Sequence, residues 1–347
     1  MNEVKAFGSY AAQKPLESLT IPRRDIQPND VQIEIQYCGI CHSDIHTVRN
    51  EWGGAQYPLV PGHEIVGKVT QVGSNVKKFK IGDSVGVGCL VDSCQTCPSC
   101  QKNLEQFCSK GATFTYNSFD KHLGKPTYGG YSSSIVVNEN FVLKISEKLN
   151  LPAVAPLLCA GITTYSPLKH WKAGPGRKVG VVGLGGLGHM AVKIASSMGA
   201  EVTMLSTSAN KEVDSKKLGA AHFAHTKDES TFKKLAGHFD LIINTISAPH
   251  DYNQYLNLLA VDGTMVLLGV PPDAIPVAAF ALIGGRRSIA GSLIGGLKET
   301  QEMLDYCAQH NIVSDIELIK PQEINVAYER MIKGDVKYRF VMDTRQL

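Results

Sequence analysis

The sequence has no long apolar stretch and no block of like charges. No apolar run approaches the roughly 18 residues that a membrane-spanning helix needs, and the N-terminal segment MNEVKAFGSY has no apolar signal core. The net charge of +3 is too small to favour a nucleic acid or an anionic membrane as a partner. We therefore expect a cytoplasmic protein with neither partner, and 347 residues are enough for two or three domains.

Cysteine, by contrast, is abundant: the chain has nine, and four of them crowd into VDSCQTCPSCQKNLEQFC. Disulfides are rare in the cytoplasm, and an odd total leaves at least one thiol unpaired. Four thiolates on one short lobe can close a tetrahedron around Zn²⁺ with no open position. They could also hold an iron or an iron–sulfur cluster, but an electron carrier needs no chain of this length. A structural zinc site is therefore favoured, with the ligands Cys94, Cys97, Cys100 and Cys108.

The pattern of apolar residues changes near residue 155. Before it, stretches such as DVQIEIQYCG and EIVGKVTQVG alternate like half-buried strands and indicate a barrel-like β domain. After it, strands alternate with helices, one of which is expected over residues 253–263, and this is typical of a doubly wound parallel sheet. The tail returns to mixed structure. We expect an α/β fold class overall, in which residues 1–155 and 294–347 form one discontinuous, barrel-like β domain and residues 156–293 form the doubly wound domain.

A glycine-rich turn lies in VGVVGLGGLGHMAVKIA, where Gly183-x-Gly185-x-x-Gly188 follows an apolar strand and opens a helix. That context makes the pattern indicate dinucleotide binding rather than a plain tight turn. Gly183 would turn the chain, Gly185 would let the backbone approach a pyrophosphate, and Gly188 would let helix and strand pack. Gly186 and Leu187 complete the turn, and the N–H groups of the helix N-terminus would face the anion.

The end of the next strand, MLSTSANKE, indicates which dinucleotide binds. An NAD site usually has an acidic residue there for the ribose hydroxyl, whereas this chain has Ser206, Thr207 and Ser208, followed by Lys211. Small hydroxyls and a lysine suit a 2′-phosphate, which a carboxylate would repel. Ser208 could instead only cap a helix and Lys211 could be solvated, but we favour NADP(H).

A second, looser set of possible metal ligands comprises Cys41, His63 and Cys159, in the stretches CGICHSDIH, VPGHEIVG and PLLCAGITTY. Their spacing alone cannot join them, because a single buried cysteine or histidine is more often part of the core. Polar neighbours around Cys41, and Glu64 beside His63, favour a site. Three protein ligands and an open position would make a catalytic zinc, which polarises an oxygen and lowers the pKa of a bound alcohol or water.

These stretches together resemble the zinc-dependent medium-chain alcohol dehydrogenases. NEWGGAQYPLVPGHEIVG, PLLCAGITTYSPL and DVKYRFV are similar to the cinnamyl alcohol dehydrogenase branch, which includes NADPH-dependent aldehyde reductases. The resemblance runs nearly from end to end. It implies a GroES-like β-barrel catalytic domain, a Rossmann domain, two zinc ions and a homodimer built through the Rossmann sheets. The implied reaction transfers hydride between NADP(H) and primary alcohols or aldehydes, aromatic or cinnamyl-type, over a broad range.

The resemblance also implies roles for individual residues. The looser set would bind the catalytic zinc, and the four-cysteine lobe the structural one. Glu64 would lie behind the catalytic metal, and Asp44 would accept the second N–H of His63. Ser43 would begin a proton relay that ends at His46, because an imidazole titrates near neutral pH.

Further residues are expected around the cofactor and the substrate. His42 would lie near the pyrophosphate and Thr163 near the nicotinamide, while Lys337 and Arg339 could reach a cofactor phosphate. The candidate substrate pocket, for which ordinary core packing is an equal alternative, comprises Trp52, Tyr57, Leu90, Phe114, Leu293 and Ile294. Cys38, Cys89 and Cys307 are expected to be small buried apolar residues.

Two other functions fit parts of the sequence. A polyol dehydrogenase would share the fold and the zinc, but Ser206 stands where an acidic residue would favour it. The other alternative is a redox sensor, structured by zinc, that binds NADPH without turnover. Proteins of this kind commonly lack the zinc ligands. All seven expected ligand positions are filled here, which favours the enzyme.

Overall fold

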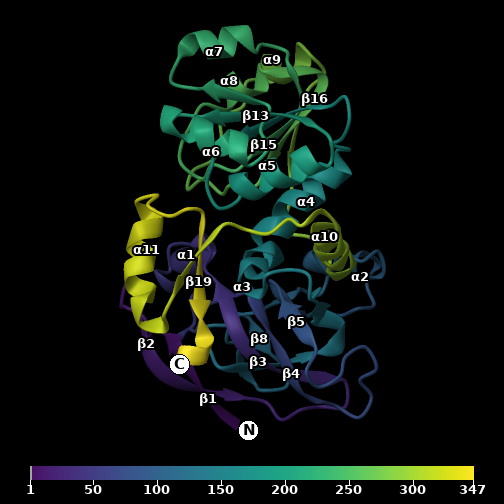
Figure 1. The fold of residues 1–347 in the computed structure, drawn as a ribbon, viewed down its shortest axis with the longest axis vertical. Helices are drawn as coiled ribbons and strands as arrows, with labels where there is room; N and C mark the ends of the chain where they lie inside the picture. The colour runs from purple at the N-terminus through teal and green to yellow at the C-terminus, as the bar shows by residue number, and fades with distance from the viewer. Residues whose placement is uncertain (1) are drawn as a thin grey trace. The chain divides into compact units, whose positions relative to one another are not determined.

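The computed structural model describes residues 2–347, which form two compact units (Figure 1). The first unit contains the chain up to Cys159 together with Gly295–Leu347, and the second contains Ala160–Ile294. The predicted range of the Rossmann domain included Cys159, whereas the structure keeps this residue in the unit that holds Cys41 and His63.

The first unit is mostly β-structure with short helices. Its strands are β1 (Asn2–Gly8), β2 (Glu17–Arg23), β3 (Asp30–Gly39), β4 (Ile65–Val72), β5 (Ser84–Val87), β6 (Leu90–Asp92), β7 (Thr113–Phe114), β8 (Phe119–Asp120), β9 (Lys125–Pro126), β10 (Ser134–Asn138), β11 (Leu143–Lys144), β18 (Ile316–Ile319) and β19 (Arg339–Asp343). Its helices are α1 (His42–Val48), α2 (Pro98–Gln101), η1 (Glu105–Phe107), η2 (Glu139–Phe141), α3 (Leu151–Val154), η3 (Ala155–Leu158), α10 (Leu297–His310), η5 (Pro321–Glu323), α11 (Ile324–Ile332) and η6 (Thr344–Gln346).

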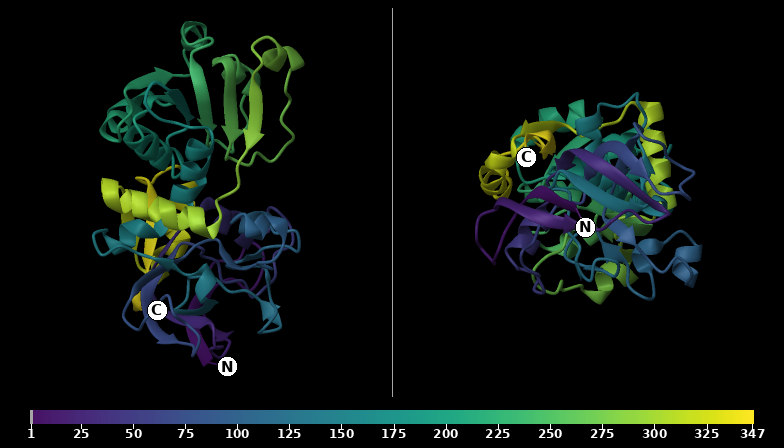
Figure 2. Two further views of the ribbon diagram at one scale, coloured as in Figure 1. Left: turned by 90° about the vertical axis from the view of Figure 1, so that its right-hand side faces the viewer. Right: turned by 90° about the horizontal axis from the view of Figure 1, so that it is seen from below.

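The main sheet of this unit has the strand order β11-β5-β4-β3-β19-β18, and β10 also pairs with β3. The expected alternation is seen in β3, where Ile33 and Ile35 are fully buried. Strand β19, from the end of the chain, pairs with β3 in antiparallel orientation. Helices α1 and α11 lie side by side (Figure 1), and Arg49 and Glu329 join them through a 2.6 Å ion pair. Figure 2 shows the C-terminal end near β1, whose Lys5 donates to the carbonyl of Leu347.

Strand pairing in this sheet explains why residues far apart in sequence meet. Strands β3 and β4 are antiparallel, with Cys38 opposite Ile65. The segment that leaves β3 toward Cys41 and the segment that enters β4 from His63 therefore lie at the same end of the sheet. Helix η3 packs on β3, β4 and β5, and Cys159 follows it directly.

The second unit is a doubly wound α/β fold. Its six strands are all parallel, in the order β14-β13-β12-β15-β16-β17. They are seen as neighbouring arrows in the left view of Figure 2. The strands are β12 (Lys178–Val182), β13 (Glu201–Ser206), β14 (His222–His225), β15 (Phe239–Asn244), β16 (Leu259–Leu267) and β17 (Ser288–Gly291). The helices are α4 (Ala160–His170), α5 (Gly188–Ser197), η4 (Ala209–Lys211), α6 (Glu212–Lys217), α7 (Glu229–Lys234), α8 (Tyr252–Leu256) and α9 (Ala279–Ile283).

The helix predicted over residues 253–263 is wrong in its second half. Helix α8 ends at Leu256, and β16 begins at Leu259, which pairs with Phe239 of β15. A short apolar run has no periodicity that separates a buried strand from a helix. Pairing with β15 supplies backbone hydrogen bonds, and the local sequence pattern does not predict this pairing.

Within residues 2–347, no single helix is both long and apolar enough to cross a membrane. Two consecutive helical segments, Leu151–Leu158 and Ala160–His170, reach that length and composition only when taken together. Most of their side chains are buried within the protein, as expected of core helices.

The glycine-rich turn joins β12 to α5. Gly183 has a φ of +91°, which favours glycine. A Cβ on Gly188 would lie 1.8 Å from the carbonyl oxygen of Gly183, so strand and helix pack too closely there for any side chain. A Cβ on Gly185 would meet no heavy atom within 4 Å. The space beside Gly185 is therefore open, whereas the space beside Gly188 is filled by backbone.

This contrast predicts that one added methyl group lowers stability at Gly188 and barely changes it at Gly185. Gly188→Ala should destabilise the second unit by about 1–3 kcal/mol, because a rigid backbone cannot move aside. Gly185→Ala should change the free energy of unfolding by less than about 0.5 kcal/mol. Thermal and urea unfolding of the two variants would check this, and equal destabilisation would contradict the described turn.

Candidate metal and cofactor sites

One group of possible metal ligands lies in the first unit. Ligand atoms of Cys41, His63, Glu64 and Cys159 all lie within 4.8 Å of one another. The Cys41 and Cys159 sulfurs are 4.0 Å apart, close to the roughly 3.8 Å that a tetrahedral ion with 2.3 Å Zn–S bonds would require. The structure thus brings together the three ligands of the looser set, with a carboxylate oxygen of Glu64 beside them, and these donor atoms could hold a zinc ion.

The start of α1 orients two of these ligands. Cys41 is the N-cap residue, and Asp44, at the third helical position, accepts the Cys41 N–H at 2.9 Å, as in a capping box. The same carboxylate is fully buried and accepts the Gly62 N–H at 3.2 Å. His63 Nδ1 lies 3.2 Å from Asp44 Oδ1. Because Nδ1 faces Asp44, Nε2 is left to face the thiols.

Glu64 and Arg339 form a buried ion pair behind the group. Arg339 Nη2 donates to Glu64 Oε1 and, at 2.8 Å, to the carbonyl of Ile40. Glu64 Oε2 is buried and accepts no hydrogen bond from the described residues. A buried acceptor without a donor beside two thiols suits a cation. Burial raises the pKa of Glu64 to about 7, and the charge of Arg339 opposes that rise.

Two thiols share the site with the Cys41 sulfur. A hydrogen bond with Cys159 and the neighbouring His63 hold the pKa of Cys41 well below its ordinary value, although burial opposes them. The neighbouring Cys159 also lowers the pKa of Cys89, whose thiol donates to the carbonyl of Leu158 at 3.9 Å. Cys89, which the sequence analysis treated as a small apolar residue, therefore lies beside the metal-ligand group. A lone cysteine in the turn between β5 and β6 carries no spacing signal that could have revealed this.

The candidate relay residues lie on and after α1. Ser43 is half-buried near the start of the helix. His46 Nδ1 lies 2.5 Å from Glu51 Oε2, and its ring stacks on Trp52 with centroids 4.9 Å apart. The sequence analysis did not single out Glu51. Its spacing of five residues from His46, on the turn after the helix, would have been the available signal.

The four-cysteine lobe forms a second group whose ligand atoms lie within 4.8 Å of one another. The Cys100 sulfur lies 3.9 Å from that of Cys94 and 3.5 Å from that of Cys97. Cys97 caps α2, which Pro98 begins. Backbone N–H groups of Cys100 and Ser109 lower the pKa of Cys97 to about 5. All nine cysteines are free thiols in the structure. The lobe thus fits a closed tetrahedral zinc.

The second unit presents an anion-binding edge. Strands β12 and β13 are parallel neighbours, so the glycine-rich turn and Ser206 follow the carboxyl ends of adjacent strands. Ser206 Oγ accepts the Ser208 N–H at 3.2 Å. Lys211 Nζ donates to the Leu184 carbonyl at 2.9 Å, which puts a positive charge against the turn. The open space at Gly185, the hydroxyls and this lysine fit a dinucleotide with an additional phosphate.

For three other residues predicted to contact the cofactor, the structure gives only their burial and local hydrogen bonds. Thr163 is buried in α4 of the second unit. His42 is the exposed first residue of α1, and Lys337 is exposed, with its N–H donated to Glu317. Both belong to the first unit, so their contact with the cofactor stays a prediction. Arg339, predicted with Lys337, is buried against Glu64.

The candidate substrate residues fall into two sets. In the first unit, Leu90 is buried and pairs with Phe114 across β6 and β7, while the hydroxyl of Tyr57 donates to the carbonyl of Val48 at 2.7 Å. Trp52, Phe114 and Leu293 are large apolar side chains with 54%, 41% and 47% of their surface exposed. Leu293 and Ile294 belong to the second unit. A common pocket for all six residues therefore stays a prediction.

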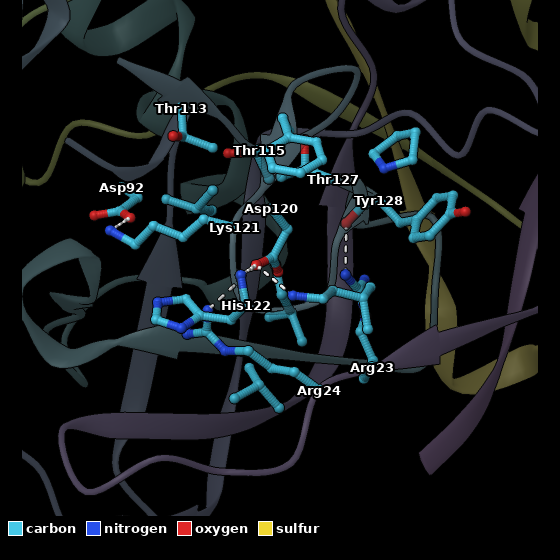
Figure 3. Close-up of a pocket in the computed structure, with 16 residues that line it drawn as sticks. Arg23, Arg24, Asp92, Thr113, Thr115, Asp120, Lys121, His122, Thr127 and Tyr128 are labelled. Atoms are coloured by element: carbon cyan, nitrogen blue, oxygen red, sulfur yellow. Dashed lines mark hydrogen bonds and ion pairs between the residues drawn. The ribbon is translucent and has the colours of Figure 1, made fainter. Parts of the chain in front are cut away.

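A separate cavity of about 40 Å³ lies in the first unit among Arg23, Arg24, Asp92, Lys121 and other residues (Figure 3). Charged side chains that line this cavity already have partners. Lys121 pairs with Asp92 at 2.5 Å, and Arg23 donates to backbone carbonyls, including that of Tyr128 at 2.6 Å. The space admits only a few water molecules, and none of its lining residues belongs to the metal-ligand groups.

Comparisons with known proteins place the chain in a family. Residues 27–147 match the family model "Alcohol dehydrogenase GroES-like domain", and residues 186–309 match "Zinc-binding dehydrogenase". The chain is 58% identical over its whole length to NADP-dependent alcohol dehydrogenase C of Mycobacterium bovis, also covered completely. It is 55% identical to aldehyde reductase YahK of Escherichia coli, with 99% of both chains covered. A solved cinnamyl alcohol dehydrogenase of Helicobacter pylori complexed with NADP(H) superposes with a TM-score of 0.93 at 46% identity, again over 99% of both chains.

These matches confirm the family, the two-domain fold class, the reaction class and the cofactor pair that the sequence analysis predicted. The two groups of possible metal ligands could each hold a zinc ion, in keeping with the match to a zinc-binding dehydrogenase. The chain belongs to the zinc-binding alcohol dehydrogenases that carry a GroES-like domain.

Proposed function

We propose that this zinc- and NADP(H)-dependent alcohol dehydrogenase acts mainly as a reductase of aldehydes, aromatic and cinnamyl-type ones included, over a broad range. The observation that carries the proposal is the meeting of Cys41, His63 and Cys159, with a buried carboxylate behind them. The four-cysteine lobe already accounts for a closed structural site. A separate three-ligand group therefore favours a metal with a different role.

Cys41, His63 and Cys159 are the proposed ligands of the catalytic zinc. Zinc in such a site supplies a Lewis acid that polarises a carbonyl and lowers the pKa of an alcohol. Asp44 fixes the ring of His63 through Nδ1. Glu64 and Arg339 pair behind the site, so each of these two buried charged groups has a partner.

Ser43 and His46 are the proposed ends of a proton relay. The Ser43 hydroxyl is half-buried close to Cys41, which suits a group that meets the substrate. The side chain of His46 is 33% exposed, so its imidazole can exchange a proton with water. Glu51 holds Nδ1 of this ring, which orients Nε2 as the exchanging nitrogen.

The second unit is proposed to bind NADP(H) through the glycine-rich turn, the hydroxyls of residues 206–208 and Lys211. The turn and the α5 N-terminus present backbone N–H groups to the pyrophosphate. The absence of a carboxylate at Ser206 removes the group that would repel a 2′-phosphate.

A homodimer joined through the second unit is also proposed. Strand β17 is an edge strand of the six-stranded sheet, and an unpaired edge readily pairs with another chain. Near it, Val261, Phe280 and Ile283 expose 70%, 82% and 68% of their surfaces. A cytoplasmic location suits nine cysteines that form no disulfide, because thiols stay reduced there.

Removal of one catalytic ligand tests the proposal. Cys159→Ala should lower kcat for NADPH with benzaldehyde or cinnamaldehyde by about 1,000-fold or more, because the metal site is lost. NADPH binding, followed by fluorescence, should persist. Cys307→Ala is the matched control, since it removes a fully buried thiol that packs near Met303.

Turnover by Cys159→Ala close to that of Cys307→Ala would contradict the ligand assignment. Complete inactivity of zinc-loaded wild-type protein across a panel of aldehydes and alcohols would contradict the enzyme itself. That result would favour an NADPH-binding sensor.

A charge at position 206 tests cofactor selection. Ser206→Asp should raise the KM for NADPH about 10-fold or more through like-charge repulsion, without raising the KM for NADH. Ser230→Asp adds the same charge to the same unit, away from the glycine-rich turn, and should leave both constants unchanged. Equal effects on NADPH and NADH would remove Ser206 from phosphate recognition.

An exposed aromatic side chain tests the dimer. Phe280→Asp should shift the protein to monomers in sedimentation velocity, because a charge would be buried in the proposed interface. Val213→Asp is the matched control, since Val213 is 63% exposed on α6 of the same unit. A wild-type protein that sediments as a monomer would refute the interface.

A further inference from the structure

A buried tyrosine lies directly behind the pair formed by His63 and Asp44. Tyr131 is fully buried, and its hydroxyl donates to Asp44 Oδ2 at 3.2 Å. The same carboxylate accepts the N–H groups of Cys41 and Gly62 and faces Nδ1 of His63. The tyrosine hydroxyl thus belongs to the set of donors that fixes the direction of the carboxylate.

The backbone around Tyr131 supports the segment that carries His63. Residues 129–131 donate three backbone hydrogen bonds, of 2.8, 2.8 and 3.0 Å, to the carbonyls of residues 60–62. The carbonyl of Tyr131 accepts the N–H of Phe7 at 2.8 Å, which ties this segment to β1. Because His63 follows residues 60–62 directly, its main chain is held against a fixed neighbour.

The ring of Tyr131 packs against the residue before His63. Gly62 has a φ of +101°, and a Cβ there would lie 2.6 Å from Cδ1 of Tyr131. Ring and peptide are therefore in direct contact, with no room for a side chain between them. The ring acts on the main chain of the ligand-bearing turn, while the hydroxyl acts on the carboxylate that orients the ligand's side chain.

We propose that Tyr131 is a positioning residue for the catalytic metal. Its hydroxyl holds Asp44 in the orientation that receives Nδ1–H of His63, so that Nε2 points toward the sulfurs of Cys41 and Cys159. The inference rests on the proposed role of these three residues as metal ligands. Residues that orient a histidine ligand change metal affinity by about 10-fold to 100-fold when altered.

Tyr131→Phe isolates the hydroxyl, because the ring, its packing on Gly62 and the backbone hydrogen bonds remain. The matched control is Tyr128→Phe, which removes a hydroxyl from a buried tyrosine of the same segment that lines the separate small cavity (Figure 3). Three quantities are measured on each protein: the rate of zinc loss to a chelator, the visible spectrum after cobalt exchange, and the melting temperature of the zinc-free form.

Tyr131→Phe should release one of the two zinc ions about 10-fold or more faster than wild type, and should shift the cobalt bands of that site. Tyr128→Phe should match wild type in both. Adding Tyr131→Phe to an Asp44→Asn protein should cause no further acceleration, because the hydroxyl acts through the carboxylate.

The proposal is overturned if the two tyrosine variants release zinc equally fast, or if Tyr131→Phe and Asp44→Asn act additively. It is also overturned if the zinc-free Tyr131→Phe protein melts far below zinc-free Tyr128→Phe, since the hydroxyl would then serve the fold. Metal release and cobalt spectra do not depend on turnover. A failure of the proposed aldehyde reduction would therefore leave this test standing.

Discussion

The arrangement of Cys41, His63 and Cys159, the proposed catalytic group, depends on one buried carboxylate. Asp44 has no contact with water, so every charge-assisted hydrogen bond it makes must come from the protein. Its partners are the N-cap of α1, the turn before His63, the ring of His63 and the hydroxyl of Tyr131. The need to satisfy this anion thus joins the helix that carries Cys41 to the strand entry that carries His63.

The cysteine ligands form two groups that the chain brings together in different ways. In the four-cysteine lobe, short sequence spacing and a proline-started helix gather the ligands, and the group fits an ion with no vacant position. In the catalytic group, the sheet gathers them: β3 and β4 pair so that Cys41 and His63 leave at the same end, and η3 adds Cys159. Glu64 and Arg339 add a buried pair of charges behind this group. The first arrangement suits an ion that stabilises a loop, and the second suits the proposed catalytic ion.

Whether a feature could be predicted from the sequence depends on how far apart in the chain its interacting residues lie. The glycine-rich turn and the four-cysteine lobe could be predicted because their function lies in local spacing. Cys41, His63 and Cys159 meet through strand pairing, so only the resemblance to a family could join them before the structure was known. Glu51 lies only five residues from His46 and was missed because that spacing alone does not show that the two side chains meet. Cys89 and Tyr131 were missed because each acts through a contact across the fold, and no neighbour in sequence marks them. The boundary between α8 and β16 was misplaced for the same reason: pairing with β15 decided it.

Cobalt exchange followed by visible spectroscopy tests the division between the two sulfur sites most directly. Fully exchanged protein should contain two cobalt ions per chain, both with intense sulfur-to-metal bands. Imidazole, a small ligand that needs a vacant position, should change the bands of one ion and leave the other untouched. One ion per chain, or two ions that both ignore imidazole, would contradict the assignment of a closed structural site and an open catalytic site.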